Sequence, residues 1–301
     1  MLKGRKFIII LLLGITGLVL LSSVSVPIQF SSKAKVPYSL DRTMDQFRST
    51  EQLAKWFLQK SDEDKVEVIS SKPGTIEMEV ETEEMSREYS IHISADPANR
   101  KHCIVDLSVY RTIWKRWFDP DPTDELMVAS LKELEAFTND TQRFYGYAIN
   151  KEQITDSCYL FMTAHVTDST KAMVTKQLFD SLTHYIQIKE QDWHGRRIFY
   201  EQPGDSAQLN IFTGTVVTCS LPTSAALGIG QKKLPSGKQQ LTAVYEGPYK
   251  DIHLVYKAMD QYRKDYSLVG LMLPFEDFLS PGYGYAPDEL VRIKVCYPIL
   301  Q

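Results

Sequence analysis

The chain has 301 residues, which is enough for two domains that each bury a core. Hydrophobic residues make up 43% of it, which excludes an intrinsically disordered chain. Subtracting the three positive charges of Lys3, Arg5 and Lys6 from the net −4 leaves −7 on the rest of the chain, so we expect no nucleic-acid partner.

An apolar segment without formal charge runs from Phe7 to Phe30. At about 1.5 Å rise per residue it is long enough to cross a bilayer, and the basic residues before it predict a cytoplasmic N-terminus. A cleaved signal peptide is the alternative, but its apolar core is usually about 7–15 residues and this run lacks a clear Ala-x-Ala site. We predict a single-pass transmembrane anchor over residues 1–30 in a bacterial cytoplasmic (inner) membrane. The soluble domains would lie on the periplasmic or extracellular side.

Residues 36–140 predict an α+β domain that follows a short polar tether, Ser31 to Pro37. A helix at Thr50–Gln59 precedes four segments in which apolar and polar residues alternate, which is typical of an antiparallel meander. These segments are "KVEVIS", "TIEMEVET", "REYSIHIS" and "HCIVDLSVYRTIW". A closing helix, Asp124 to Thr138, aligns Met127, Leu131, Leu134 and Phe137 on one stripe.

In this order of elements, residues 36–140 resemble the START-like (SRPBCC, polyketide-cyclase-like) helix-grip family. The resemblance implies a curved antiparallel sheet that grips the long closing helix. An apolar cavity would lie between sheet and helix and offer a second apolar surface. The first strand of the domain would fall on "VPYSLDRTM".

The cysteines and histidines predict neither a metal site nor a cofactor. The four cysteines, Cys103, Cys158, Cys219 and Cys296, are scattered singly without a Cys-x-x-Cys pair, and no histidine pair has zinc-binding spacing. Each cysteine falls in or beside a predicted strand, which favours buried free thiols. An oxidising compartment would still permit one or two disulfides.

Residues 145–301 contain a weak internal repeat with the order strand, helix, strand, strand. The first copy is "SCYLFMTAHV", "STKAMVTKQLFDSLTHYIQI", "RRIFYEQ" and "AQLNIFTGTVV"; the second is "QQLTAVYEG", a helix from Asp251, "VGLMLPFEDF" and "LVRIKVCYPI". A Gly/Pro/Ser-rich connector that contains "GIGQKK" joins them and predicts a loop. Two such units predict a duplicated α+β domain with pseudo-twofold symmetry and a central cleft.

The segment "LPSGKQQLTAVYEGPYKDIHLVYKAM" joins a turn, a strand, a Gly-Pro-Tyr corner and a helix. Gly247 permits a sharp exit from the strand, and Pro248 presets φ near −65°, so Tyr249 is held at the corner. Together with "FEDFLS" and the terminal "LVRIKVCYPI", this segment resembles the GyrI-like (AraC-type effector-binding) family over residues 145–301. The resemblance implies a small-molecule-binding domain.

Glu276 follows Leu271, Leu273 and Phe275 in a strand that should line the cleft. A carboxylate there would be desolvated, with a raised pKa, unless a cation or a donor satisfied it. The resemblance implies that Glu276 recognises cationic or polar aromatic ligands through charge and cation–π contacts. If the strand register slips by one residue, Glu276 faces solvent and Asp277 faces inward.

The other predicted ligand-binding residues are aromatic. They are Tyr249 and Phe275 in the second repeat and Phe199 and Tyr200 in the first, with Glu201 as a weaker candidate. We therefore expect a membrane-anchored protein that binds a lipophilic or cationic small molecule, with no protein partner identified. The alternatives are a hydrolase of reactive small molecules that uses Glu276 as catalytic base, and an envelope scaffold with collapsed clefts.

Overall fold

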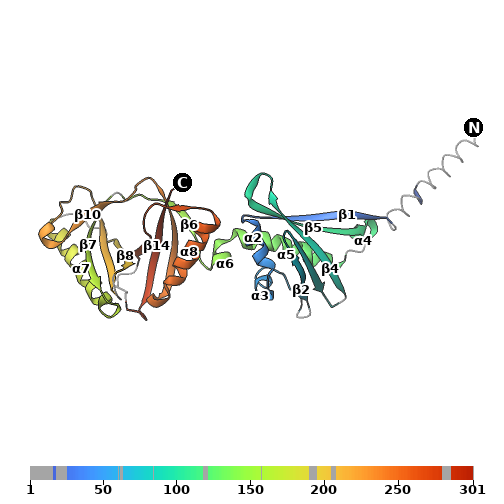
Figure 1. The fold of residues 1–301 in the computed structure, drawn as a ribbon, viewed down its shortest axis with the longest axis horizontal. Helices are drawn as coiled ribbons and strands as arrows, with labels where there is room; N and C mark the ends of the chain where they lie inside the picture. Colours follow the sequence, from blue (N-terminus) through green and yellow to red (C-terminus); the bar gives the residue numbers. More distant parts are fainter. Residues whose placement is uncertain are drawn as a thin grey trace, which may run out of the picture. The chain divides into compact units, whose positions relative to one another are not determined.

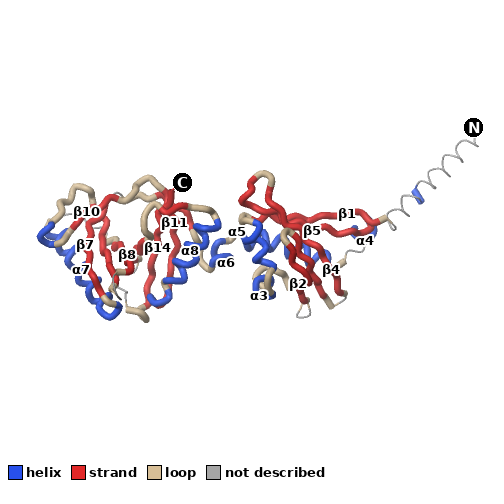
Figure 2. The backbone as a smooth tube through the Cα atoms, in the orientation of Figure 1, coloured by secondary structure: helices blue, strands red, loops and turns tan. Residues whose placement is uncertain are grey.

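The computed structural model describes residues 16–17, 26–59, 61, 64–83, 85–117, 121–156, 158–189, 195–204, 208–279 and 286–300. The chain divides into two compact units, Met1–Asp140 and Thr141–Gln301, and each unit has one antiparallel sheet with helices (Figures 1 and 2). The fold class is therefore α+β, as predicted. Most of the predicted anchor lies outside the described residues. Within the described part of the chain, no helix has the length and apolar character needed to span a bilayer.

The first unit contains a five-stranded sheet in the order β1-β5-β4-β3-β2. Its elements are β1 (Pro27–Val36), α2 (Leu40–Met44), η1 (Asp45–Phe47), α3 (Thr50–Leu53), β2 (Lys65–Lys72), β3 (Thr75–Glu81), β4 (Ser86–Asp96), β5 (Asn99–Thr112), α4 (Ile113–Trp117) and α5 (Pro122–Asn139). Strands β2 to β5 pair antiparallel in sequence order, which confirms the predicted meander. Helix α5 contacts β1 and β3, and Met127, Leu131, Leu134 and Phe137 are buried, as the stripe predicts.

Four predictions for the start of this unit are wrong, namely the end of the anchor, the tether, the first strand and the end of the first helix. Pro27–Val36 pairs along its whole length with β5, so its residues belong neither to an anchor nor to a tether. The segment predicted as first strand contains helix α2 instead, and α3 ends at Leu53 rather than at Gln59. The anchor was predicted to extend to Phe30 because the segment carries no charge. The pairing of this segment was not predicted, since its partner strand β5 lies far along the chain.

The second unit contains a nine-stranded sheet in the order β10-β7-β9-β8-β13-β14-β11-β6, with β12 paired to β14. Its elements are α6 (Thr141–Tyr145), β6 (Asn150–Gln153), β7 (Cys158–Val166), α7 (Asp168–Ile188), β8 (Arg197–Pro203), β9 (Leu209–Val217), η2 (Ala225–Leu227), β10 (Gly230–Lys233), β11 (Gln239–Pro248), η3 (Tyr249–Asp251), α8 (His253–Asp265), β12 (Val269–Gly270), β13 (Phe275–Phe278) and β14 (Leu290–Leu300).

The predicted duplication is confirmed by this topology. The first copy is β7-α7-β8-β9 and the second is β11-α8-β13-β14. In the sheet the copies run in opposite order, β7-β9-β8 and then β13-β14-β11, so a pseudo-twofold axis passes between β8 and β13. The two repeats therefore meet at the β8–β13 pair.

Both faces of this sheet are partly buried. On one face, Phe179 of α7 and Val255 and Met259 of α8 share a core with Phe199 and Ile293 of the sheet. The other face carries a separate core that contains Tyr159, Ile198, Phe275 and Cys296. Because successive side chains on a strand point to opposite faces, neighbouring residues of β13 enter different cores.

The cysteines divide into two pairs. Cys103 and Cys296 are buried free thiols, as predicted, whereas Cys158 and Cys219 form a disulfide. The prediction of free thiols failed there because β7 and β9 are neighbours in the sheet, and Cys158 pairs in register with Val217. The predicted loop at "GIGQKK" is also wrong in part, since Gly230–Lys233 forms the edge strand β10 against β7.

Candidate functional site

Glu276 lies at the junction of the two repeats. In β13 it stands opposite Phe199 of β8 on one side and Val295 of β14 on the other. Its side chain is on the face that α7 and α8 cover, and the residue is only 3% exposed. The solvent-facing alternative for Glu276 is therefore wrong, and the chain buries a carboxyl group in the middle of its largest sheet.

Two tyrosine hydroxyl groups donate hydrogen bonds to this carboxyl group. The Tyr249 hydroxyl lies 3.3 Å from both Oε1 and Oε2 of Glu276, and the Tyr256 hydroxyl lies 3.2 Å from Oε1. Tyr249 comes from η3 and Tyr256 from α8. Among the described residues, Glu276 forms no ion pair within 4.0 Å. Neutral phenol donors, and not a paired cation, are its direct partners.

The Gly-Pro-Tyr corner explains how Tyr249 reaches Glu276. Gly247 has φ +156°, and a Cβ atom there would lie 2.7 Å from the Tyr245 hydroxyl oxygen. That hydroxyl donates to the Pro248 carbonyl oxygen at 2.6 Å, so the corner leaves no room for a side chain at residue 247. The chain turns at once from β11 into η3, and Tyr249 points back over the sheet.

Burial raises the pKa of Glu276 to about 8. The negative charge of Glu201 raises this pKa as well, while Lys171 and the hydrogen bonds from Tyr256 and Tyr249 lower it. Burial, with the nearby Glu276 carboxyl, also raises the pKa of Tyr256 well above its usual value. At neutral pH the Glu276 carboxyl is therefore mostly protonated, and an incoming cation would favour its ionised form.

Lys171 supplies the positive charge of the site. It lies in the first turn of α7, with its ammonium group 4.9 Å from the centre of the Tyr249 ring and 6.0 Å from that of Phe199. The same ammonium group is 2.7 Å from Glu201 Oε2. Glu276, Tyr249, Tyr256, Phe199, Lys171 and Glu201 together are called the Glu276 site below.

The structure brings together only part of the predicted site. Glu276, Tyr249 and Phe199 meet, but Phe275 and Tyr200 lie on the opposite face of the sheet, where both belong to the second core. Phe275 directly precedes Glu276, and Tyr200 directly follows Phe199, so the two-residue period of a strand forces each pair apart. Tyr200 instead stacks on Phe212, with ring centres 4.2 Å apart.

Sequence reasoning missed two members of the site. Tyr256 lies in the helix predicted from Asp251 and was not named as a site residue, although a buried tyrosine hydroxyl usually needs a hydrogen-bond partner. Lys171 was not singled out, although the first turn of a helix disfavours a cation. Both signals are weak, because they indicate that a partner exists without saying which residue it is.

The Glu276 site is closed in this structure. Phe199 is 0% exposed, Glu276 3% and Tyr249 5%, so the predicted central cleft is packed with side chains. The part of the site that faces solvent consists of Lys171 and Glu201, whose side chains are 13% and 38% exposed. A ligand that contacts Glu276 would have to displace some of these side chains.

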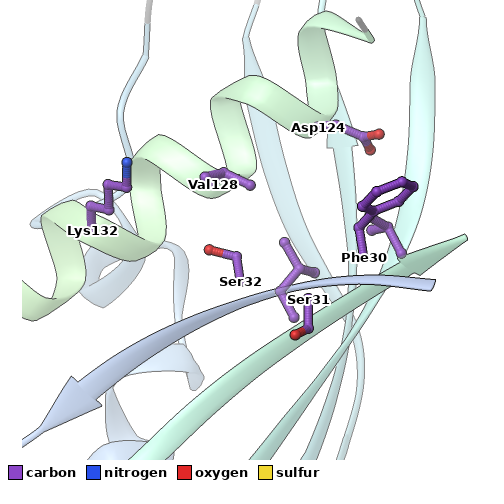
Figure 3. Close-up of a pocket in the computed structure, with 8 residues that line it drawn as sticks. Phe30, Ser31, Ser32, Asp124, Val128 and Lys132 are labelled. Carbon is purple, nitrogen blue, oxygen red and sulfur yellow. The ribbon is translucent and has the colours of Figure 1, made fainter. Parts of the chain in front are cut away.

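A pocket of about 250 Å³ lies in the first unit, between α5 and the strands β1 and β5 (Figure 3). Its lining residues are Phe30, Ser31, Ser32, Leu107, Val109, Asp124, Val128 and Lys132. Asp124 accepts hydrogen bonds from the Tyr89 hydroxyl at 2.7 Å and from Arg111 at 2.8 Å. A pocket thus lies between the sheet and α5, at the place predicted for the cavity. Its lining mixes apolar and charged residues, whereas the predicted cavity is apolar.

The described residues contain no cluster of three or more His, Cys, Asp or Glu side chains that could hold a metal ion. No protein-family model matches the chain, and a search of curated proteins returns no match. Solved structures do match, at low identity.

The C-terminal domain of EcmrR is 11% identical over 52% of this chain and 98% of that domain, with a TM-score of 0.42. An EcmrR–DNA complex is 10% identical over 63% of this chain and 76% of the matched chain, with a TM-score of 0.42. SAV2435 bound to tetraphenylphosphonium is 10% identical over 50% of this chain and 93% of that chain, with a TM-score of 0.32.

The resemblance of residues 145–301 to the GyrI-like family stays a prediction, because all three TM-scores are below 0.5. At these identities the likeness concerns fold alone. The assignment of residues 36–140 to the START-like family and the expected lack of a nucleic-acid partner both stay predictions. The site is defined by this chain's own residues.

Proposed function

We propose that this is a membrane-anchored small-molecule-binding protein and that its Glu276 site binds lipophilic cations. The observation that carries the proposal is a buried carboxyl group surrounded by the rings of Tyr249, Tyr256 and Phe199. Ionised Glu276 would supply a negative charge, and the rings would supply cation–π contacts and apolar area. Both contributions grow stronger where water is excluded, as it is at this position.

The proposal also places both units outside the cytoplasm, next to the membrane. The apolar run that starts at Phe7 leads directly into β1, and the end of the sheet at which β1 begins exposes apolar and aromatic side chains. These are Val26, Ile28, Tyr110, Ile113 and Trp114, each at least 36% exposed. Exposed aromatic residues beside a predicted span suit the interface between lipid and water. The disulfide suits an oxidising compartment.

Calorimetric titration of the full-length protein with tetraphenylphosphonium at pH 8.5 tests the binding proposal. This cation is chosen as the probe because SAV2435 was solved bound to it. We expect Glu276→Gln to weaken binding at least about tenfold, a loss of about 1.4 kcal/mol. Glu246→Gln is the matched control, since it makes the same change on an exposed side chain of β11. Equal affinity of the unsubstituted protein and Glu276→Gln would overturn the proposal.

Cell fractionation tests the location. We expect the full-length chain to stay with the membrane after an alkaline wash, and protease added to spheroplasts to digest it. Release by the wash, or protection from protease until the cells are lysed, would contradict the proposed anchor and its orientation.

A second candidate, hydrolysis, is favoured by one observation. A carboxyl group with a pKa of about 8 can exchange a proton near neutral pH, which general acid–base catalysis requires. In this case an epoxide or an activated ester would be turned over, and Glu276→Gln would abolish turnover while tetraphenylphosphonium binding persisted. Absence of turnover in the unsubstituted protein would remove this candidate.

A further inference from the structure

Lys171 stands where helix electrostatics disfavour it. It is in the first turn of α7, at the positive end of the helix dipole, where acidic residues are the stabilising choice. Asp168 in the same turn follows that preference. The contacts of Lys171 with the Glu276 site offset this disfavoured position, so the site holds the lysine in place.

The ammonium group of Lys171 makes the contacts that a bound cation would make. It lies over the face of Tyr249, at 4.9 Å from the ring centre, and closer to that ring than to Phe199 at 6.0 Å. It is paired with Glu201 at 2.7 Å, and it stabilises the ionised form of Glu276. A cation–π contact with tyrosine is therefore already occupied by a residue of the chain itself.

The charge balance of the site allows it to bind one additional cation. The titratable groups that face one another are Glu276, Glu201, Lys171, Tyr249 and Tyr256. With Lys171 paired to Glu201 and Glu276 protonated, the site carries no net charge. If a ligand cation took over the Tyr249 ring, Lys171 could keep Glu201 as its partner near solvent, and Glu276 could ionise beside the ligand.

Exposure indicates the route of exchange. Solvent reaches 13% of the Lys171 side chain, whereas Glu276 and Phe199 are almost fully buried. A lysine side chain is flexible, and its ammonium group regains hydration energy when it moves outward into solvent. Lys171 can therefore leave the ring without unfolding α7.

We propose that Lys171 is a built-in competitor for the ligand, and that a cation binds by displacing its ammonium group from the Tyr249 ring. This inference rests on the proposed function and names its ligand class. Small hydrated cations gain nothing over the tethered lysine, because they bring the same charge without apolar surface. Bulky lipophilic monocations bury apolar surface that the lysine ammonium group lacks. They are therefore the class of cation that can displace Lys171.

Lys232 is a matched control within the same unit. It lies on β10 over Phe161 at 4.9 Å and Phe212 at 5.1 Å, which is the same kind of cation–π contact. Its ammonium group is also 3.4 Å from the Tyr200 hydroxyl, among residues of the opposite face of the sheet. Lys232→Met removes the same charge as Lys171→Met without touching the Glu276 site.

The test is calorimetric titration of the full-length protein with tetraphenylphosphonium at pH 7, on the unsubstituted protein, Lys171→Met, Lys232→Met and Glu276→Gln. We expect Lys171→Met to bind at least about tenfold more tightly and Lys232→Met to bind as the unsubstituted protein does. Lys171→Gln, which keeps a polar end for Glu201, serves if Lys171→Met does not fold, and the same gain is expected of it.

The outcomes separate the two proposals. Equal or weaker binding by the folded Lys171 variants, or an equal gain in Lys232→Met, would overturn the role of Lys171 while leaving the proposed function intact. If none of the four proteins binds tetraphenylphosphonium, the proposed function itself is overturned. Binding by Lys171→Met alone would also overturn the proposed function, since the unsubstituted protein would then bind no cation.

Discussion

Glu276 and Asp277 are neighbours in one short strand, both are 3% exposed, and yet their surroundings differ in kind. Asp277 faces the second core, where the Arg196 guanidinium donates to its Oδ2 at 3.0 and 2.7 Å, and Asp156 also pairs with Arg196. Glu276 faces the helices and meets tyrosine hydroxyl groups instead.

The difference teaches which buried carboxyl group is available for a ligand. Asp277 already has a charged partner with two donor atoms, so its ion pair belongs to the packing of the sheet. Glu276 has donors that stabilise it only in part, and burial leaves its pKa at about 8. A carboxyl group that is buried without a matched cation is a candidate for binding or catalysis.

The largest expected effect is on the pH dependence of stability. Glu276 has a folded-state pKa of about 8 against an ordinary value of 4.5, so between these values the folded protein binds more protons than the unfolded chain. The free energy of unfolding should therefore fall as pH rises through this window, by at most about 1.4 kcal/mol per pH unit from this group. Glu276→Gln should remove that slope in urea unfolding series from pH 5 to 9. An unchanged slope would contradict the buried carboxyl group.

Asp277→Asn should cost about 1–3 kcal/mol at pH 7, because it removes the carboxylate charge that accepts from two nitrogen atoms of the half-buried Arg196 and leaves Asp156 as the other charged partner. Glu276→Gln should cost less at the same pH, since it replaces a mostly protonated carboxyl group by a neutral amide. Urea unfolding of both variants compares the two faces directly. If Glu276→Gln proves the more damaging of the two at pH 7, the distinction between a structural and a binding carboxyl group is wrong.

Removing one tyrosine hydroxyl group should have a smaller effect. Tyr249→Phe and Tyr256→Phe each take one donor from Glu276, at a cost of about 0.5–1.5 kcal/mol. Because these hydrogen bonds lower the pKa of Glu276, each variant should also shift its titration to higher pH. Carbon-13 NMR of labelled glutamate measures that shift, and Tyr200→Phe on the opposite face is the control. A titration unaffected by Tyr249→Phe would show that the hydroxyl does not act on the carboxyl group.

Much of the second unit follows from its sequence. The repeated order of strand, helix, strand and strand predicts β7-α7-β8-β9 and β11-α8-β13-β14. The corner at Gly247 and the burial of Glu276 follow from local chemistry. These features depend on periodicity and on single residues, which a sequence displays.

The partners of each residue were harder to predict. Phe275 and Tyr200 were chosen for their aromatic character, but strand alternation places them away from Glu276. Lys171 reaches the site from the other repeat, and β1 finds its partner in β5, more than half the unit away along the chain. Such contacts depend on which strands become neighbours, and neither composition nor spacing determines that.

The most direct test of a cation site at Glu276 is the number of protons released when tetraphenylphosphonium binds to the full-length protein at pH 7. Calorimetry in two buffers of different ionisation enthalpy measures this number. Because Glu276 is mostly protonated at pH 7 and ionises beside the cation, we predict release of close to one proton, and none in Glu276→Gln. Binding without proton release, or the same release in Glu276→Gln, would contradict the account.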